Sequence, residues 1–265
     1  MTDSGPTHIR SRDNAWLKEL RRLSQDGGAY RKQARVWLEG DHLCRAALQR
    51  GVTPQVAVFA ESFWSEAPVH WSQGAVKVVV LEDRLFADIS ALESPAQVGF
   101  VLDLASLSPE IALIGAKAPT VILDRVQDAG NVGSILRSAS AFGFKQVLAL
   151  KGTAALWSPK VLRAGMGAHF GLQLFEGLDV SDLDRLDVPL ITTSSHLGGF
   201  LHQQSLPMPC AWALGHEGQG VGEAVAARSQ FQVRIAQPGG EESLNVAAAA
   251  AVCLHASCVA VSGPI

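Results

Sequence analysis

Several features common in secreted, membrane and metal-binding proteins are missing from this chain of 265 residues. Its four cysteines include no Cys-x-x-Cys pair and none at zinc-finger spacing to a histidine. We therefore expect reduced thiols, a cytoplasmic protein and no metal site. The N-terminus is polar and lacks the apolar run of a signal peptide, and His255 and Ser257 interrupt the apolar stretch 246–261. We expect no secretion signal and no membrane span.

Charge is also scarce, since only 18% of the residues are charged and the net charge is −3. The 48% of hydrophobic residues are enough for sizeable buried cores. Residues 1–50 hold ten Lys/Arg and six Asp/Glu, a balance of 10 − 6 = +4, which leaves 12 − 19 = −7 for the rest. Phosphate contacts supply most of the affinity for nucleic acids, so the basic N-terminal part is the better candidate for RNA binding. Taken alone, this pattern is more typical of a solvated helix face.

Strand-like and helical patterns alternate along the whole chain, which predicts an α/β protein. Ser and Pro residues punctuate 105–119, so we expect one domain at 1–110 and another at 111–265. In the first domain we expect strands at 35–39, 56–60, 76–81 and 98–104, helices at 14–25 and 83–89, and a further helix that follows the strand 35–39 and runs through 48. In the second we expect strands at 120–125, 146–151, 172–175, 188–193, 210–215 and 231–236. Helical stretches between the later strands favour a largely parallel sheet.

Three of the later strands run into loops that carry glycine and polar residues, at 128–139, 211–222 and 233–247. Open α/β sheets bind ligands at the carboxyl ends of their strands. Three such loops in order therefore favour a ligand site over three unrelated turns.

The first loop reads Asp128-Ala129-Gly130-Asn131-Val132-Gly133 and continues into a helical pattern that contains Arg137. Asn131 is expected where the helix begins, between two glycines that give the backbone freedom. A helix N-terminus followed by an arginine is a place to hold an anion. The alternative is a simple N-cap with a surface arginine.

The joint pattern of Asn131…Arg137, Leu214-Gly215-His216-Glu217-Gly218 and Ser243-Leu244-Asn245 resembles the three motifs of the SpoU (TrmH) family. These enzymes are RNA ribose 2′-O-methyltransferases of the knotted, S-adenosylmethionine-dependent SPOUT class. The resemblance runs from about residue 118 to the C-terminus. A weaker one covers about 14–104, where 36–48 is similar to the start of the family's substrate-binding domain, which has a ribosomal-protein-like α/β fold. The resemblance therefore implies a SPOUT-type knotted domain preceded by this small domain.

The resemblance also implies site residues. For the catalytic site they are Asn131, Arg137, Glu217, Ser243 and Asn245. For the cofactor they are Thr193, Leu214, Gly215, Gly218, Ile235 and Leu244, with glycine at 215 allowing the backbone to approach the adenosine. For RNA they are Lys160 and Arg163, in the segment similar to the one near the target nucleotide. Several have simpler explanations: Thr193 as a strand residue, Lys160 as a solvated helix start, Ser243 as an N-cap and Glu217 as a structural loop residue.

The glycine loop itself separates two cofactor classes. It reads G-x-x-G-x-G-x-G from Gly215 to Gly222, which differs from the dinucleotide pattern G-x-G-x-x-G, and no acidic residue lies between Glu223 and Glu241 to bind a ribose. Glu217 would repel a pyrophosphate but tolerates the sulfonium cation of S-adenosylmethionine. The loop therefore favours the methyl donor over NAD and disfavours a nucleotide-dependent oxidoreductase.

Arginine is a poor general base because its guanidinium stays protonated. We therefore expect Arg137 to grip the phosphate beside the target ribose and to stabilise the developing alkoxide. Ribosomal RNA is the expected substrate, transfer RNA is the alternative substrate, and a non-catalytic RNA-binding protein of the same fold is the alternative function. The family resemblance and the Ala-rich C-terminal helix, expected at 243–261, also predict a homodimer.

Overall fold

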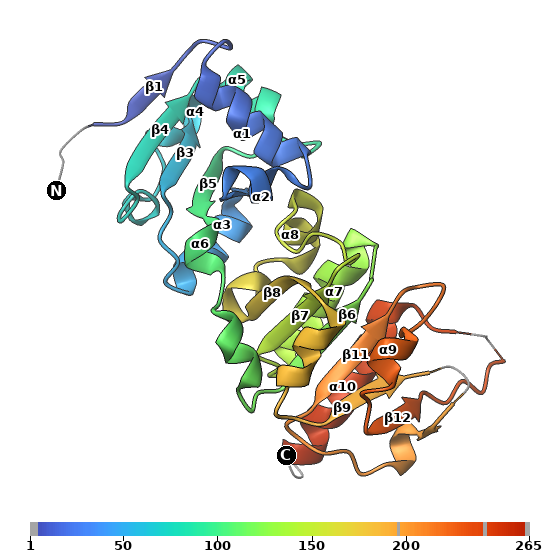
Figure 1. Cartoon of the computed structure of the whole chain (residues 1–265). Coiled ribbons are helices and arrows are strands. Elements are labelled where there is room, and N and C mark those ends of the chain that lie inside the picture. The colour runs from blue at the N-terminus through green and yellow to red at the C-terminus, as the bar shows by residue number, and fades with distance from the viewer. Residues whose placement is uncertain (1–4, 195–196, 241–242, 263–265) are drawn as a thin grey trace. The chain divides into compact units, whose positions relative to one another are not determined.

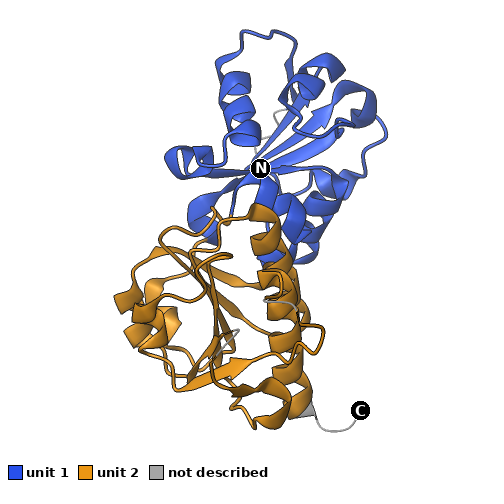
Figure 2. Ribbon diagram, turned by 90° about the vertical axis from the view of Figure 1, so that its right-hand side faces the viewer, with its two compact units in different colours: residues 1–107, 157–170 blue, residues 108–156, 171–265 orange. Residues whose placement is uncertain are grey.

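The computed structural model describes residues 5–194, 197–240 and 243–262, with side chains described up to 260 (Figure 1). The chain forms two compact units, coloured separately in Figure 2. Unit 1 comprises residues 1–107 and 157–170, and unit 2 comprises 108–156 and 171–265. Residues 157–170 therefore fold with the N-terminal part of the chain. The sequence-based domain limits 1–110 and 111–265 place this segment in the second domain instead.

Unit 1 is built on a mixed sheet with the strand order β1-β4-β3-β5-β2. Strands β1, β4 and β3 run parallel, whereas β5 is antiparallel to both β3 and β2. The strands are β1 (Thr7–Ile9), β2 (Arg35–Glu39), β3 (Val56–Ala60), β4 (Lys77–Leu81) and β5 (Val98–Asp103). The helices are α1 (Ala15–Gln25), α2 (Ala29–Gln33), α3 (Asp41–Gln49), α4 (Glu61–Trp64), η1 (Val69–Trp71), α5 (Asp83–Ile89), α6 (Leu104–Leu107) and α8 (Pro159–Gly165).

Helix α8 is an integral part of unit 1. It contacts α1 and β2, and its side chains Val161 and Leu162 are buried. A Cβ added at Gly27, just after α1, would lie 3.6 Å from Cβ of Ser158, the residue that caps α8. The segment that follows α8 packs just as closely against α3, because a Cβ at Gly167 would overlap Cβ of Ala46. Apolar packing therefore holds 157–170 in unit 1.

Unit 2 is built on a parallel sheet with the strand order β10-β12-β9-β11-β6-β7-β8. Its strands are β6 (Thr120–Asp124), β7 (Gln146–Leu150), β8 (Gln173–Leu178), β9 (Leu190–Thr193), β10 (Gly199–Phe200), β11 (Ala211–Gly215) and β12 (Phe231–Arg234). Its helices are η2 (Ile111–Gly115), α7 (Ala129–Ala141), η4 (Val180–Arg185), η5 (Leu201–Gln203), α9 (Glu223–Ala226) and α10 (Val246–Ser262), and η3 (Ala168–Gly171) spans the change of unit.

The order in which the strands of this sheet follow one another reverses beside β6. Strands β7 and β8 follow β6 on one side, whereas β11, β9 and β12 lie on the other. Such a switch point is where open parallel sheets leave room for a ligand beyond their carboxyl ends. The α/β fold with a parallel second sheet is confirmed, and the knot stays a prediction.

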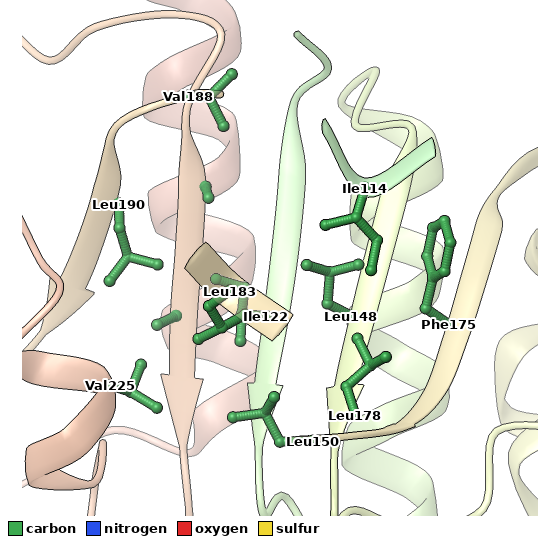
Figure 3. Close-up of a cluster of buried hydrophobic side chains, with 12 residues drawn as sticks. Ile114, Ile122, Leu148, Leu150, Phe175, Leu178, Leu183, Val188, Leu190 and Val225 are labelled. Atoms are coloured by element: carbon green, nitrogen blue, oxygen red, sulfur yellow. The ribbon is translucent and has the colours of Figure 1, made fainter. Parts of the chain in front are cut away.

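Both faces of the unit 2 sheet are covered, as buried parallel strands require. One face carries the apolar cluster of Figure 3, in which Ile122, Leu148 and Phe175 come from neighbouring strands. On β11, Ala211 and Ala213 belong to this cluster, whereas the indole Nε1 of Trp212 donates a hydrogen bond to Ser257 Oγ of α10 at 2.9 Å. Strand β11 is therefore packed between the cluster and the C-terminal helix.

Two helix starts differ from the sequence expectation. Helix α7 begins at Ala129 with Asp128 as its N-cap, so Asn131 lies inside the first turn instead of capping it. Helix α10 begins at Val246 instead of residue 243, because Asn245 Oδ1 accepts hydrogen bonds from the amides of Ala247 and Ala248 at 2.9 and 3.3 Å. The N-cap explanation proposed for Ser243 is therefore wrong.

Candidate active site

A cavity of about 740 Å³ lies at the carboxyl ends of the parallel strands β9, β11 and β12. Strands β6 and β11 end side by side, with Asp124 opposite Gly215, and β9 and β12 continue the same edge. The cavity is lined mainly by residues of 192–194, 215–221 and 243–246. Three chain segments far apart in sequence therefore meet at one carboxyl edge.

Most of the residues predicted for the cofactor line this cavity. They are Thr193, Gly215, Gly218, Ile235 and Leu244. Leu214 does not, because its side chain is fully buried within β11. Of the residues predicted to be catalytic, Glu217, Ser243 and Asn245 line the cavity, whereas Asn131 and Arg137 do not.

Asn131 nevertheless joins the other two motifs. Its Nδ2 donates to Glu217 Oε1 at 3.1 Å, and its Oδ1 accepts from Asn245 Nδ2 at 2.9 Å. The side chains Asn245, Asn131 and Glu217 thus form one hydrogen-bonded chain across three loops. Because both polar groups of the Asn131 amide are engaged within the protein, its side chain holds the loops together.

The carboxylate of Glu217 lies at the N-terminus of α7. Its carboxylate accepts hydrogen bonds from the amides of Gln127 at 3.2 Å and Asp128 at 3.1 Å, in addition to the one from Asn131. Burial raises the pKa of Glu217, but hydrogen bonds from its own amide, Asn131, Asp128 and Gln127 outweigh burial and leave the pKa below its usual value. The anion at this helix N-terminus is therefore a side chain of the protein itself.

The predicted RNA-facing cations are less constrained. Arg137 is exposed on α7, and it makes no hydrogen bond or ion pair with any residue that the structure describes. Lys160 and Arg163 belong to α8 of unit 1, and within the described ranges they too have no carboxylate partner. All three guanidinium or ammonium groups are thus available to an external anion.

The charges along the cavity are of one sign. Glu217 and Glu223 line it, and no Lys or Arg stands among the described lining residues. Gln237 also lines it, and its buried Oε1 lacks a hydrogen-bond partner in the part of the chain that the structure describes. The cavity therefore favours a cationic ligand that can donate a hydrogen bond.

Sequence reasoning missed Gln219, Glu223, Gln232 and Gln237 as lining residues. These residues lie after β11 or within and after β12, and this position at the strand ends could have indicated that they line the site. The described residues contain no cluster of His, Cys, Asp or Glu that could hold a metal ion. No helix in the described ranges is both long and apolar enough to cross a membrane.

The chain matches two family models. The SpoU rRNA methylase family model matches residues 118–255, and the model of an MRM3-like substrate-binding domain matches residues 14–99. Bacillus subtilis 23S rRNA (guanosine(2553)-2′-O)-methyltransferase RlmP is 30% identical over 222 residues, which are 82% of this chain and 86% of that protein. The chain therefore belongs to the SpoU rRNA methylase family.

Other relatives match over different lengths. Mitochondrial rRNA methyltransferase 3A of Danio rerio is 37% identical over 158 residues, which are 58% of this chain but only 36% of that protein. A TrmH-family protein from Porphyromonas gingivalis has a solved structure with a TM-score of 0.78 and 30% identity, covering 93% of this chain and 98% of that one. An AdoMet-bound rRNA methyltransferase from Sinorhizobium meliloti has the same fold, with a TM-score of 0.81, 23% identity and coverage of 95% and 97%.

The glycine at 215 is required by the loop itself. A Cβ there would overlap the backbone of Gly220 and Val221, where the loop folds back on itself through His216 N to Gly220 O at 3.0 Å and Gly220 N to His216 O at 2.8 Å. The sequence suggested that glycine at 215 lets the backbone approach the adenosine, and the fold of the loop adds a second reason for glycine at this position.

We predict that Gly215→Ala opens this loop while unit 2 stays folded, because the new Cβ can be accommodated only by separating the two backbones. Hydrogen exchange of the peptide covering 211–222 should become fast at the His216 and Gly220 amides. Gly239→Ala is the matched control, since a Cβ there meets nothing within 4 Å and Gly239 does not adopt a positive φ. Unchanged protection in Gly215→Ala would contradict this explanation.

Proposed function

We propose that this protein transfers a methyl group from S-adenosylmethionine to the ribose 2′-hydroxyl of a nucleotide in ribosomal RNA. The observation that carries the proposal is the hydrogen-bonded chain Asn245–Asn131–Glu217, which gathers three loops beside one acidic cavity. Membership of the SpoU rRNA methylase family and the names of the relatives support the reaction and the substrate.

The cavity fits S-adenosylmethionine better than a dinucleotide. Glu217 and Glu223 favour a sulfonium cation and would repel a pyrophosphate. Leu197 and Leu244 line the cavity with 62% and 41% of their surface exposed, which offers apolar walls to an adenine ring. The unpartnered Oε1 of Gln237 suits an amino donor of the ligand. S-adenosylmethionine, when bound, supplies an activated methyl group.

The protein's own contribution is to position the ribose and to stabilise charge. Asn131 and Asn245 are engaged with each other, so we assign them to holding the loops, together with Glu217. Ser243 lines the cavity and is available to orient the ribose. Arg137 has no partner among the described residues, and its permanent charge suits a phosphate beside the target and the negative charge that develops on the 2′-oxygen as its proton passes to solvent water.

We predict that Arg137→Ala lowers kcat for RNA methylation by about a hundredfold or more, because one charge-stabilising donor is removed. The dissociation constant for S-adenosylmethionine should stay near that of the wild type, since Arg137 does not line the cavity. Calorimetry and a methyl-transfer assay separate the two effects. Lys145→Ala is the control, because it removes another exposed cation of unit 2 that has no ion-pair partner among the described residues. Near-normal turnover of Arg137→Ala would remove this residue from the mechanism.

RNA affinity must come from local cations, because neither unit is strongly basic. Residues 1–107 and 157–170 hold 14 Lys/Arg and 13 Asp/Glu, a balance of +1, and unit 2 holds 8 and 12, a balance of −4. The basic balance of residues 1–50 therefore does not extend over the rest of the N-terminal domain. Unit 1 holds three cations without an ion-pair partner in the described ranges on two helices that contact each other: Arg22 in the last turn of α1, and Lys160 and Arg163 of α8.

We predict that Lys160→Ala/Arg163→Ala weakens RNA binding and reduces the salt dependence of the affinity. The plot of log K against log salt has a negative slope, and the magnitude of this slope should decrease by roughly 0.7–0.9 for each phosphate that the variant no longer binds. Filter binding at several salt concentrations measures this slope. Lys151→Ala, which removes an exposed lysine of unit 2 paired with Asp179, is the control. An unchanged slope would exclude α8 from the RNA surface.

Deleting residues 1–110 is a poor test of RNA recognition. Helix α8 would remain in the truncated protein and would lose the α1 and β2 surfaces that cover its apolar side chains. Point substitutions in the full chain avoid this. Comparing purified ribosomal and transfer RNA as methyl acceptors then decides between the two substrates, and S-adenosylmethionine binding without transfer to either would favour the non-catalytic alternative.

We also propose that the protein acts as a homodimer in the cytoplasm. Val252 and Val259 of α10 are 43% and 49% exposed, and an apolar cavity of about 560 Å³ lies beside Val252, with Leu201 and Ile235 in its lining. The buried free thiols of Cys44, Cys210 and Cys253 suit a reducing compartment.

We predict a dimeric mass by light scattering at micromolar concentration, because the exposed apolar residues of α10 would be covered. Val252→Asp should shift the mass toward the monomer, and a charge change at exposed Lys145, Lys145→Glu, should leave it unchanged. A monomeric wild type would contradict the proposal.

A further inference from the structure

Asp124 and Arg125 form an ion pair at the end of β6 that the sequence motifs do not include. Arg125 Nε donates to Asp124 Oδ1 at 2.9 Å, and Nη2 donates to Oδ2 at 3.3 Å. The Asp124 side chain is only 5% exposed, whereas that of Arg125 is 34% exposed. The arginine therefore neutralises a buried carboxylate and still reaches the surface.

The backbone holds Arg125 in an unusual conformation. Its φ is +61°, in the left-handed region that side-chain-bearing residues seldom adopt. The Arg125 amide donates to Thr153 Oγ1 at 3.2 Å, and that hydroxyl donates to Leu123 O at 2.9 Å. The conformation is thus fixed by neighbours and directs the side chain toward the loop after β11.

The ion pair holds this loop at two points. Arg125 Nη1 donates to Gln219 Oε1 at 2.9 Å, and Asp124 Oδ2 accepts from the Gly222 amide at 2.6 Å. A Cβ at Gly222 would lie 3.0 Å from Arg125 Nη2 and 3.1 Å from Asp124 Oδ2, so the loop passes close to the pair. Gln219 lines the cavity, but Arg125 does not.

We propose that Arg125 is a positioning residue that sets the affinity for S-adenosylmethionine by fixing Gln219 and the second half of the 215–222 loop. Glu217 anchors the first half of this loop to α7, and the Asp124–Arg125 pair anchors the second half to β6. This inference rests on the proposed function. It adds a residue that acts on the cavity from outside its lining.

The test compares the dissociation constant for S-adenosylmethionine in Arg125→Lys, Gln219→Ala and the double variant. Lysine keeps a charge beside Asp124 but lacks the fork that reaches both partners. Each single variant should bind about three- to tenfold more weakly, as expected when one hydrogen bond is removed. The double variant should bind no more weakly than the weaker single one, because both substitutions remove the same hydrogen bond. Gln219→Glu should bind more tightly than Gln219→Ala, since a carboxylate accepts the same hydrogen bond.

Kinetics separate positioning from a general loss of structure. In Arg125→Lys the KM for S-adenosylmethionine should rise with the dissociation constant, while kcat at saturating cofactor and the Tm stay near the wild-type values. Arg228→Lys is the control. Arg228 pairs with Asp184 through Nε and Nη2 at 2.7 and 3.3 Å, and its side chain is also 34% exposed. Its Nη1 donates to Ala224 O at 2.8 Å, and neither Asp184 nor Ala224 lies in the 215–222 loop.

Three results would overturn the inference alone: normal cofactor affinity in Arg125→Lys, additive losses of affinity in the double variant, or a fall in Tm that accounts for the weaker binding. Absence of S-adenosylmethionine binding by the wild-type protein would instead overturn the proposed function, and this inference with it.

Discussion

The arrangement of the candidate site depends on the hydrogen-bonded chain formed by Asn245, Asn131 and Glu217. Each residue follows a different strand of the sheet, and the three segments are separated by long stretches of sequence. Asn245 also caps α10, and Glu217 also accepts two amides at the start of α7. The same side chains therefore cap α10, hold the residues directly before α7 and connect three segments, so that helix capping and assembly of the site share one set of interactions.

The sheet explains why these loops meet at all. Strands β6, β11, β9 and β12 run in one direction, so their carboxyl ends share an edge beside the point where the strand order reverses. The glycine loop then folds back on itself, with no room for a side chain at Gly215. Carboxylates on this loop serve two purposes: Glu217 anchors it, and together with Glu223 it gives the cavity its negative charge. Rigid loops and one sign of charge suit a cationic donor held in place for reaction.

Much of this architecture was predictable from the sequence, because strands, helices and turns follow from local patterns of apolar, polar and glycine residues. Apolar runs such as 146–151 predicted strands, and the glycine-rich ends of three strands predicted loops at one edge. Features that depend on contacts distant in sequence were not predictable. The grouping of α8 with unit 1 depends on packing against α1, and the true role of Asn131 depends on Asn245 and Glu217. Arg125 carried no sequence signal, because a left-handed φ at a non-glycine residue follows from its neighbours.

The proposed reaction is tested most directly by locating the methyl group after the purified protein is incubated with ribosomal RNA and S-adenosylmethionine carrying a labelled methyl. A 2′-O-methyl group removes the hydroxyl that attacks the neighbouring phosphodiester in alkali. We predict a labelled nucleotide whose 3′ phosphodiester bond resists alkaline hydrolysis and whose mass increase lies in the ribose fragment. A label on the base, or S-adenosylmethionine binding without transfer to any RNA, would contradict ribose methylation by this protein.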